Sequence, residues 1–309
     1  MANVGTLCKS RSIGTLSRRS ARTRFRQRLE HMVVPRPASR RTTDSPLAAG
    51  IARSRGDAVD LSALTPVERV NQFWLKRDDT FEICGVNGGK ARACLALARS
   101  ARQGLVTASA RKSPQGAIVA AIAGHLGLSS CVHTAAGALT PELGQARLLG
   151  AELIFHKPGY NSVIIRRARD AAAMAGWTII PFGMECSDAI RLTARQAGNL
   201  PAEAKRVVVP VGSGVTLAGI LTGLAEMRWR LPVLGVVVGA DPTRRLDVWA
   251  PAEWRKMVRL RRSQLTYHCI AIEACIAGIA LDPIYEAKCL PFLKEGDCLW
   301  VVGHRHTRC

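Results

Sequence analysis

Short apolar runs rich in β-branched residues alternate with alanine-rich helical stretches over most of the chain, and this alternation limits the folds open to it. The cycle repeats about every 25 residues from residue 105 to residue 238. Strands that alternate with helices form mainly parallel sheets covered by those helices. The irregular ends favour an open, doubly wound sheet over a barrel of eight equal units. The sequence therefore predicts an α/β protein.

The hydrophobic pattern also places the individual elements. Strands are expected at residues 73–76, 105–109, 130–134, 152–156, 178–180, 206–211, 233–238 and 298–302. Helices are expected at residues 90–102, 115–126, 141–149, 162–175, 188–198 and 216–227.

Positive charge is concentrated at the amino-terminal end. Residues 1–55 contain 13 Lys and Arg and 2 Asp and Glu, and residues 56–309 contain 31 and 21, so the formal +21 divides into +11 and +10. Such an acid-poor segment without helical periodicity is predicted to be a disordered leader. Three explanations stay open: a transit peptide, a basic arm for phosphate backbones, or upstream sequence before a later start such as Met32.

The rest of the composition favours a cytoplasmic protein. No apolar run approaches the roughly 20 residues that cross a bilayer, and the first 20 residues lack the apolar core of a secretory signal. The ten cysteines include no C-x-x-C pair and no Cys/His cluster of zinc spacing. We therefore expect reduced thiols, no metal site and no membrane partner.

The first candidate for a ligand site is the segment Gly-Val-Asn-Gly-Gly-Lys-Ala-Arg at residues 85–92. Glycines before a lysine at a helix start let the backbone approach a ligand, and the N–H dipoles there favour anions. A phosphate-binding P-loop needs glycine where Cys84 stands and Ser or Thr where Ala91 stands, so that motif is excluded. Taken alone, Lys90 is more often a solvated helix-start residue.

The second candidate is the turn Gly212-Ser213-Gly214-Val215-Thr216, which follows an apolar strand and opens a helix. Successive N–H groups and the two hydroxyls can surround a phosphate. Leu217 stands at the third glycine position of the dinucleotide fingerprint, so a mononucleotide-sized phosphate fits better. A strand–helix turn without a ligand is the alternative.

The third candidate is the run Leu-Asp-Pro-Ile-Tyr-Glu at residues 281–286. Tyr285 and Glu286 lie side by side before an apolar strand around Trp300. Taken alone, the run can be an ordinary helix start after Asp282 and Pro283.

In this order, the three segments and a serine-centred turn after the strand at 105–109 resemble 1-aminocyclopropane-1-carboxylate deaminase and D-cysteine desulfhydrase, over about residues 61–303. The segments at 74–81 and 181–186 are also similar to PLP-dependent enzymes encoded by bacteriophages. The resemblance implies the tryptophan-synthase-β-like fold of pyridoxal 5'-phosphate (PLP) enzymes, with two doubly wound parallel-sheet subdomains and the site between them. The catalytic domain would span 56–309, with a smaller subdomain at about 104–185.

The resemblance also implies residue roles. Lys90 would form the Schiff base with the cofactor, and residues Gly212, Ser213, Gly214, Val215 and Thr216 would hold its phosphate. Glu286 would face the pyridine nitrogen, and Tyr285 would be an acid/base or leaving-group residue.

The serine-centred turn departs from the family pattern. Where relatives have Ser-Asn, this chain has Ser113-Pro114-Gln115, and proline cannot donate a hydrogen bond to the ring hydroxyl. We expect Ser113 to take a catalytic or substrate-binding role and Gln115 to bind the substrate carboxylate or reach the ring hydroxyl instead.

Three functions follow from these observations. The first is lyase or deaminase chemistry at the α-carbon of a small amino acid, in an enzyme that could form a homodimer. The second is a phage-type enzyme acting on an amino acid attached to a modified DNA base, which the +10 outside the leader favours. The third is an inactive binding protein that keeps the fold, an alternative suggested by Pro114 at the position where relatives have Asn.

Overall fold

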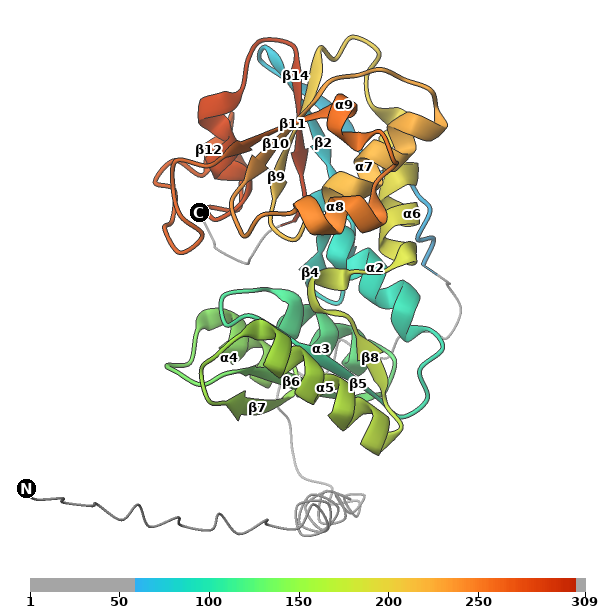
Figure 1. The fold of residues 1–309 in the computed structure, drawn as a ribbon, viewed down its shortest axis with the longest axis vertical. Helices are drawn as coiled ribbons and strands as arrows, with labels where there is room; N and C mark the ends of the chain where they lie inside the picture. The colour runs from blue at the N-terminus through green and yellow to red at the C-terminus, as the bar shows by residue number, and fades with distance from the viewer. Residues whose placement is uncertain (1–58, 304–309) are drawn as a thin grey trace, which may run out of the picture. The chain divides into compact units, whose positions relative to one another are not determined.

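Two separate β-sheets organise the chain in a computed structural model that describes residues 59–303 (Figure 1). The predicted leader at residues 1–55, and the boundary after it, lie outside the described residues.

The larger sheet has six strands in the order β1-β2-β14-β9-β10-β11. Strands β1 and β2 are antiparallel, and all other neighbours are parallel. Strand β14, near the carboxyl end of the chain, is inserted between β2 and β9, so it ties the first and middle parts of the sequence together. In chain order the strands are β1 (Val67–Val70), β2 (Phe73–Arg77), β9 (Arg206–Val211), β10 (Val233–Val237), β11 (Val258–Arg262) and β14 (Asp297–Val301).

The smaller sheet is wholly parallel, in the order β7-β6-β5-β8. The chain moves outward from β5 (Gly104–Ala108) through β6 (Ser129–Ala135) to β7 (Glu152–His156), then crosses to the other side of β5 for β8 (Thr178–Ile180). Such a reversal of strand order leaves a crevice at the carboxyl ends of the strands, where α/β proteins bind ligands.

Helices cover both sheets. One face of the larger sheet packs in an apolar cluster with four helices, which are α2 (Gly88–Ala98), α6 (Ser187–Gln196), α7 (Val215–Glu226) and α8 (Thr243–Trp249). The other face packs against residues that include those of η4 (Glu286–Phe292). In the smaller sheet, α5 (Asn161–Ala175) covers one face, and α3 (Gln115–His125) and α4 (Pro141–Leu148) cover the other. The short elements are β3 (Glu82–Ile83), β4 (Val86–Asn87), β12 (Cys275–Ile276), β13 (Ile279–Ala280), α9 (Trp254–Met257), η1 (Asp78–Thr80), η2 (Phe182–Met184) and η3 (Ala197–Asn199).

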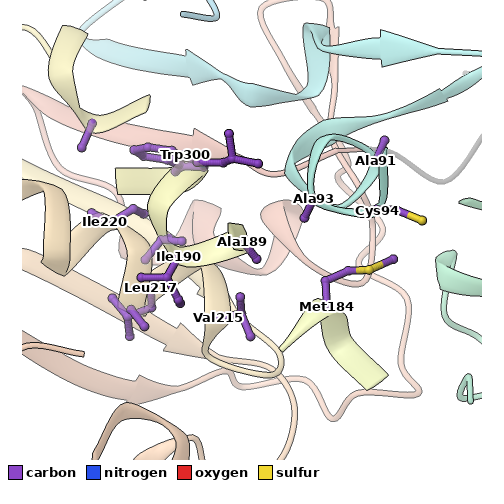
Figure 2. Packing of buried hydrophobic residues seen from close by; sticks show 14 of the residues in the cluster. Ala91, Ala93, Cys94, Met184, Ala189, Ile190, Val215, Leu217, Ile220 and Trp300 are labelled. Atoms are coloured by element: carbon purple, nitrogen blue, oxygen red, sulfur yellow. The ribbon is translucent and has the colours of Figure 1, made fainter. Parts of the chain in front are cut away.

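The largest apolar cluster lies between α2, α6, α7 and the larger sheet. Figure 2 shows Trp300 of β14 beside residues of α6 and α7, with Ala91, Ala93 and Cys94 of α2 nearby. Trp300 is fully buried. This packing fixes the helix that carries Lys90 against the sheet.

All eight predicted strands and all six predicted helices are present, which confirms the predicted α/β class. The helix expected at 90–102 begins earlier, at Gly88, and ends earlier, at Ala98. The pattern analysis missed β1 and β11, which form the two edges of the larger sheet. Both sequences mix charged and apolar residues, Val-Glu-Arg-Val in β1 and Val-Arg-Leu-Arg-Arg in β11, as is typical of an edge strand that is partly exposed to solvent.

Between residues 59 and 303, no helix is long and apolar enough to cross a membrane. The same residues contain no group of three or more His, Cys, Asp or Glu side chains placed to hold a metal ion.

Candidate active site

Lys90 lies in the first turn of α2, just after the β3–β4 hairpin. The helix begins at Gly88, whose φ is +85°, a left-handed conformation that favours glycine. A Cβ atom at Gly88 would lie 2.2 Å from the carbonyl oxygen of Val302, so the helix start rests directly on the chain that leaves β14. No side chain larger than hydrogen fits there.

A buried ion pair fixes the same turn from below. Arg92 Nη1 lies 2.7 Å from Asp78 Oδ1, and each side chain is 1% exposed. A Cβ atom at Gly89 would lie 2.7 Å from Asp78 Oδ2, so the carboxylate presses against the residue before Lys90. The guanidinium of Arg92 also stacks over the ring of Phe81, 4.6 Å from its centroid. Lys90 is therefore held on a rigid base.

The glycine-rich turn joins the end of β9 to the start of α7. Gly214, at φ +93°, is the residue before the helix, and the free N–H groups of the first helical turn lie beyond it. A Cβ atom at Gly212 would lie 2.9 Å from Tyr285 Cε1 and 3.2 Å from its hydroxyl oxygen, so Tyr285 packs on bare backbone. The N–H groups of a glycine-rich helix start are suited to binding an anion.

These segments meet around one cavity. The side that we call the lysine wall contains Gly89, Lys90, Gly212, Ser213, Gly214, Thr216 and Tyr285. The side that we call the α3–α4 wall contains Pro114, Ala117, Ile118, Glu142 and Gln145. The cavity therefore combines residues attached to the larger sheet with residues attached to the smaller one.

Most of the predicted cofactor residues lie in the lysine wall, and two do not line the cavity. Val215 is buried at the start of α7 and packs in the core. Glu286 is fully buried, and its Oε1 accepts a 2.7 Å hydrogen bond from the backbone N–H of Val302, which does line the cavity. Within residues 59–303, Glu286 Oε2 has no hydrogen-bond partner. Burial raises the pKa of Glu286 well above its usual range, and the nearby Asp282 carboxylate adds to the effect.

The predicted substrate residues lie outside the cavity lining. Gln115 is buried, and its amide nitrogen donates to Thr107 Oγ1 at 2.8 Å and to the carbonyl of Pro181 at 2.9 Å, while its oxygen accepts from Gly183 N–H at 2.7 Å. Gln115 thus holds the ends of β5 and β8 together, and its contact with substrate or cofactor stays a prediction. Ser113 Oγ accepts from the N–H of Gln115 at 3.3 Å, and Pro114 faces the cavity instead.

The pattern analysis missed four polar residues of the cavity lining: Asn87, Glu142, Gln145 and Asp282. Asn87 and Asp282 lie inside the candidate segments 85–92 and 281–286 but were given no role there, and Asp282 Oδ1 accepts hydrogen bonds from the N–H groups of Ile284 and Tyr285. Glu142 and Gln145 lie on α4, where their only sequence signal is a spacing of three residues on one helix face.

A family model described as pyridoxal-phosphate-dependent enzyme matches residues 56–280. The chain belongs to this family. No curated protein matches the sequence significantly. The family uses PLP, so the question is whether Lys90, the glycine-rich turn and the buried Glu286 fit this cofactor.

Solved structures of PLP enzymes share the fold. A homologue of 1-aminocyclopropane-1-carboxylate deaminase is 22% identical, with a TM-score of 0.66 over 78% of this chain and 89% of that one. Threonine deaminase isoform 2 from Solanum lycopersicum is 15% identical, with a TM-score of 0.57 over 79% and 80%. Serine racemase from Dictyostelium discoideum is 14% identical, with a TM-score of 0.57 over 79% and 93%. At these identities the likeness confirms the tryptophan-synthase-β-like fold and leaves the reaction open.

The residues present fit the cofactor. The turn at 212–216 offers backbone N–H groups and two hydroxyls for a phosphate, Lys90 offers an amine in the same cavity, and Glu286 offers an acceptor oxygen behind it. The similarity to bacteriophage enzymes stays a prediction.

Proposed function

We propose that the protein catalyses deamination or elimination at the α-carbon of a small amino acid, with Lys90 as the residue that carries the cofactor. One observation carries this proposal: Lys90, Tyr285 and the phosphate-type turn at 212–216 line the same cavity. When bound through a lysine amine, PLP withdraws electrons from the substrate α-carbon and makes loss of its proton feasible.

The lysine wall supplies the groups that hold the cofactor and move the proton. The N–H groups at the start of α7 and the hydroxyls of Ser213 and Thr216 bind the phosphate. With the cofactor present, the Lys90 amine would be the general base that accepts the α-proton of the substrate. Its position depends on the Asp78–Arg92 ion pair beneath the helix start.

Glu286 partners the ring nitrogen in this proposal. An N–H donor directed at Oε2 would satisfy the one carboxyl oxygen that has no partner in the described part of the chain. A pyridinium close to this carboxyl group would favour its charged form and so lower its raised pKa.

Tyr285 provides the second acid/base group. Its ring packs on Gly212, and Asp282 fixes its backbone, so the phenol is held at the edge of the phosphate-type turn. In deamination or elimination, the phenol would donate a proton to the group that leaves the substrate, and Tyr285→Phe should therefore lower kcat more than it changes KM.

The test is the purified full-length protein loaded with PLP. Absorbance at about 410–430 nm shows cofactor bound through a lysine. Both enantiomers of serine, threonine and cysteine, and the achiral 1-aminocyclopropane-1-carboxylate, are then assayed for ammonia, oxoacid and sulfide. Release of these products supports the proposal. Interconversion of enantiomers without release would mean a racemase, and a protein without the visible band would be an inactive binding protein.

A further inference from the structure

The α3–α4 wall presents one carboxylate and one amide to the cavity. Glu142 and Gln145 are three residues apart on α4, so they lie on one face of the helix, and both line the cavity. Both are partly buried.

The start of α4 is held in place by the hydrogen bonds of Thr140 and by apolar packing of the helix face that does not line the cavity. Thr140 Oγ1 accepts from the N–H of Leu143 at 3.4 Å and donates to the carbonyl of Arg111 at 2.6 Å. Leu143 and Ala146 are buried, and Ala146 packs in an apolar cluster with residues of α3 and β6. The helix therefore cannot rotate its polar face away from the cavity without exposing this apolar face.

The charged residues of the cavity indicate which kind of substrate group binds at the face of α4 that carries Glu142 and Gln145. Among the described residues that line the cavity, the charged ones are Lys90, Glu142 and Asp282, and none is arginine or histidine. Lys90 is the cofactor lysine, and Asp282 binds backbone N–H groups at the start of the Tyr285 segment. With the cofactor phosphate present, the Glu142 carboxylate adds to the negative charge, which disfavours an acidic substrate side chain and stabilises a cationic one.

We propose that Glu142 and Gln145 form a subsite for an ammonium group on the substrate side chain, so that the substrate is a diamino acid. An ammonium group has three donors and no acceptor, and the Glu142 carboxylate and the Gln145 amide oxygen supply acceptors for it. This inference rests on the proposed function, because it assumes that the amino acid binds in this cavity.

The test compares two amino acids of similar length on the PLP-loaded full chain, 2,4-diaminobutyrate and its uncharged counterpart homoserine, each as both enantiomers. Dissociation constants are measured by calorimetry and by the change in visible absorbance. Glu142→Gln should weaken diaminobutyrate binding roughly tenfold or more and change homoserine binding less than about twofold, because a charge-assisted hydrogen bond is lost for the first ligand alone. The control is Glu152→Gln, which removes an exposed carboxylate from β7 of the smaller sheet and should change neither constant.

Charge reversal at Glu142 gives a second test, which depends on a gain of binding to an acidic amino acid and not on a loss of binding. Glu142→Lys should make aspartate bind more tightly than diaminobutyrate. Equal weakening of diaminobutyrate and homoserine in Glu142→Gln, or a fall in kcat for all substrates at unchanged binding, would overturn the subsite and make Glu142 a structural or acid/base residue. The visible band separates the two proposals: a parent without it refutes the proposed function, whereas a parent with it and no preference for diaminobutyrate refutes the subsite.

Discussion

The two walls of the cavity are built in different ways. The lysine wall consists mainly of backbone turns, where glycines leave room for close approach and a buried ion pair supports the helix start. The α3–α4 wall consists of side chains on two helices whose other faces pack on the smaller sheet. A helix face can exchange its side chains without changing the fold, whereas a backbone turn cannot. In the functions that we propose, the first wall therefore holds the cofactor and the second selects the substrate.

The largest expected effect tests the lysine wall. Lys90→Ala should abolish the absorbance at about 410–430 nm, because no other lysine lines the cavity among the described residues. The far-ultraviolet circular dichroism should stay the same, since Lys90 is only partly buried. The control, Lys112→Ala in the turn near the α3–α4 wall, should keep the band. A band that survives in Lys90→Ala would remove the basis of the proposed function.

The ion pair under Lys90 gives the next effect, on stability. Asp78→Asn should lower the free energy of unfolding by about 3–5 kcal/mol in urea denaturation, because it leaves the buried Arg92 charge without its partner. The matched control is Asp188→Asn, whose ion pair with Arg191 is exposed and should contribute less than about 1 kcal/mol. Equal losses in the two variants would show that the buried Asp78–Arg92 ion pair stabilises the fold no more than an exposed one.

The lysine wall was largely predictable from the sequence, and the α3–α4 wall was not. Gly88 and Gly214 adopt left-handed backbone conformations, and Gly212 leaves room for the Tyr285 ring, so all three leave a trace in the sequence. Glu142 and Gln145 reach the cavity because α4 packs on the smaller sheet, a tertiary fact that helical spacing alone does not contain. For Gln115 the sequence suggested a ligand contact, whereas in the structure its side chain hydrogen-bonds to Thr107 at the end of β5 and to Gly183 after β8.

A smaller effect is expected in the sheet behind the α3–α4 wall. His133 Nδ1 lies 2.9 Å from His156 Nε2, and His156 Nδ1 lies 3.1 Å from Arg167 Nη1. Burial, then the charges of His156 and Arg167, lowers the pKa of His133 from 6.5 to about 4. The unfolded chain therefore binds more protons than the folded protein between these values, and stability falls as the pH drops through this window.

The loss attributable to His133 is about 3 kcal/mol at most, from the size of the pKa shift. Unfolding free energies at pH 7 and pH 4 should differ less in His133→Gln than in the parent, while the exposed control His125→Gln should follow the parent. Hydrogen exchange at pH 5 should then rise in β6 and β7 before it rises in β9 and β14. Simultaneous opening of both sheets would mean that the two regions do not differ in acid sensitivity.

The smallest expected effect concerns nucleic acid and the basic turn beside the α3–α4 wall. Arg111 Nη2 donates to the carbonyl of Ala138, and a Cβ atom at Gly137 would collide with the guanidinium, so this charge braces the loop before α4. Replacing Arg111 and Lys112 by glutamine in the full chain should therefore change duplex DNA affinity no more than replacing Arg261 and Arg262 on the edge strand β11, both of which are exposed. Two lost phosphate contacts would reduce the slope of log affinity against log salt by about 1.8. If the Arg111 and Lys112 change reduces the slope by this amount and the β11 change does not, phosphates bind beside the α3–α4 wall. If product also formed only on modified DNA, an amino acid attached to a DNA base would replace the free amino acid as the proposed substrate, and the proposed roles of Lys90 and the 212–216 turn would be unaffected.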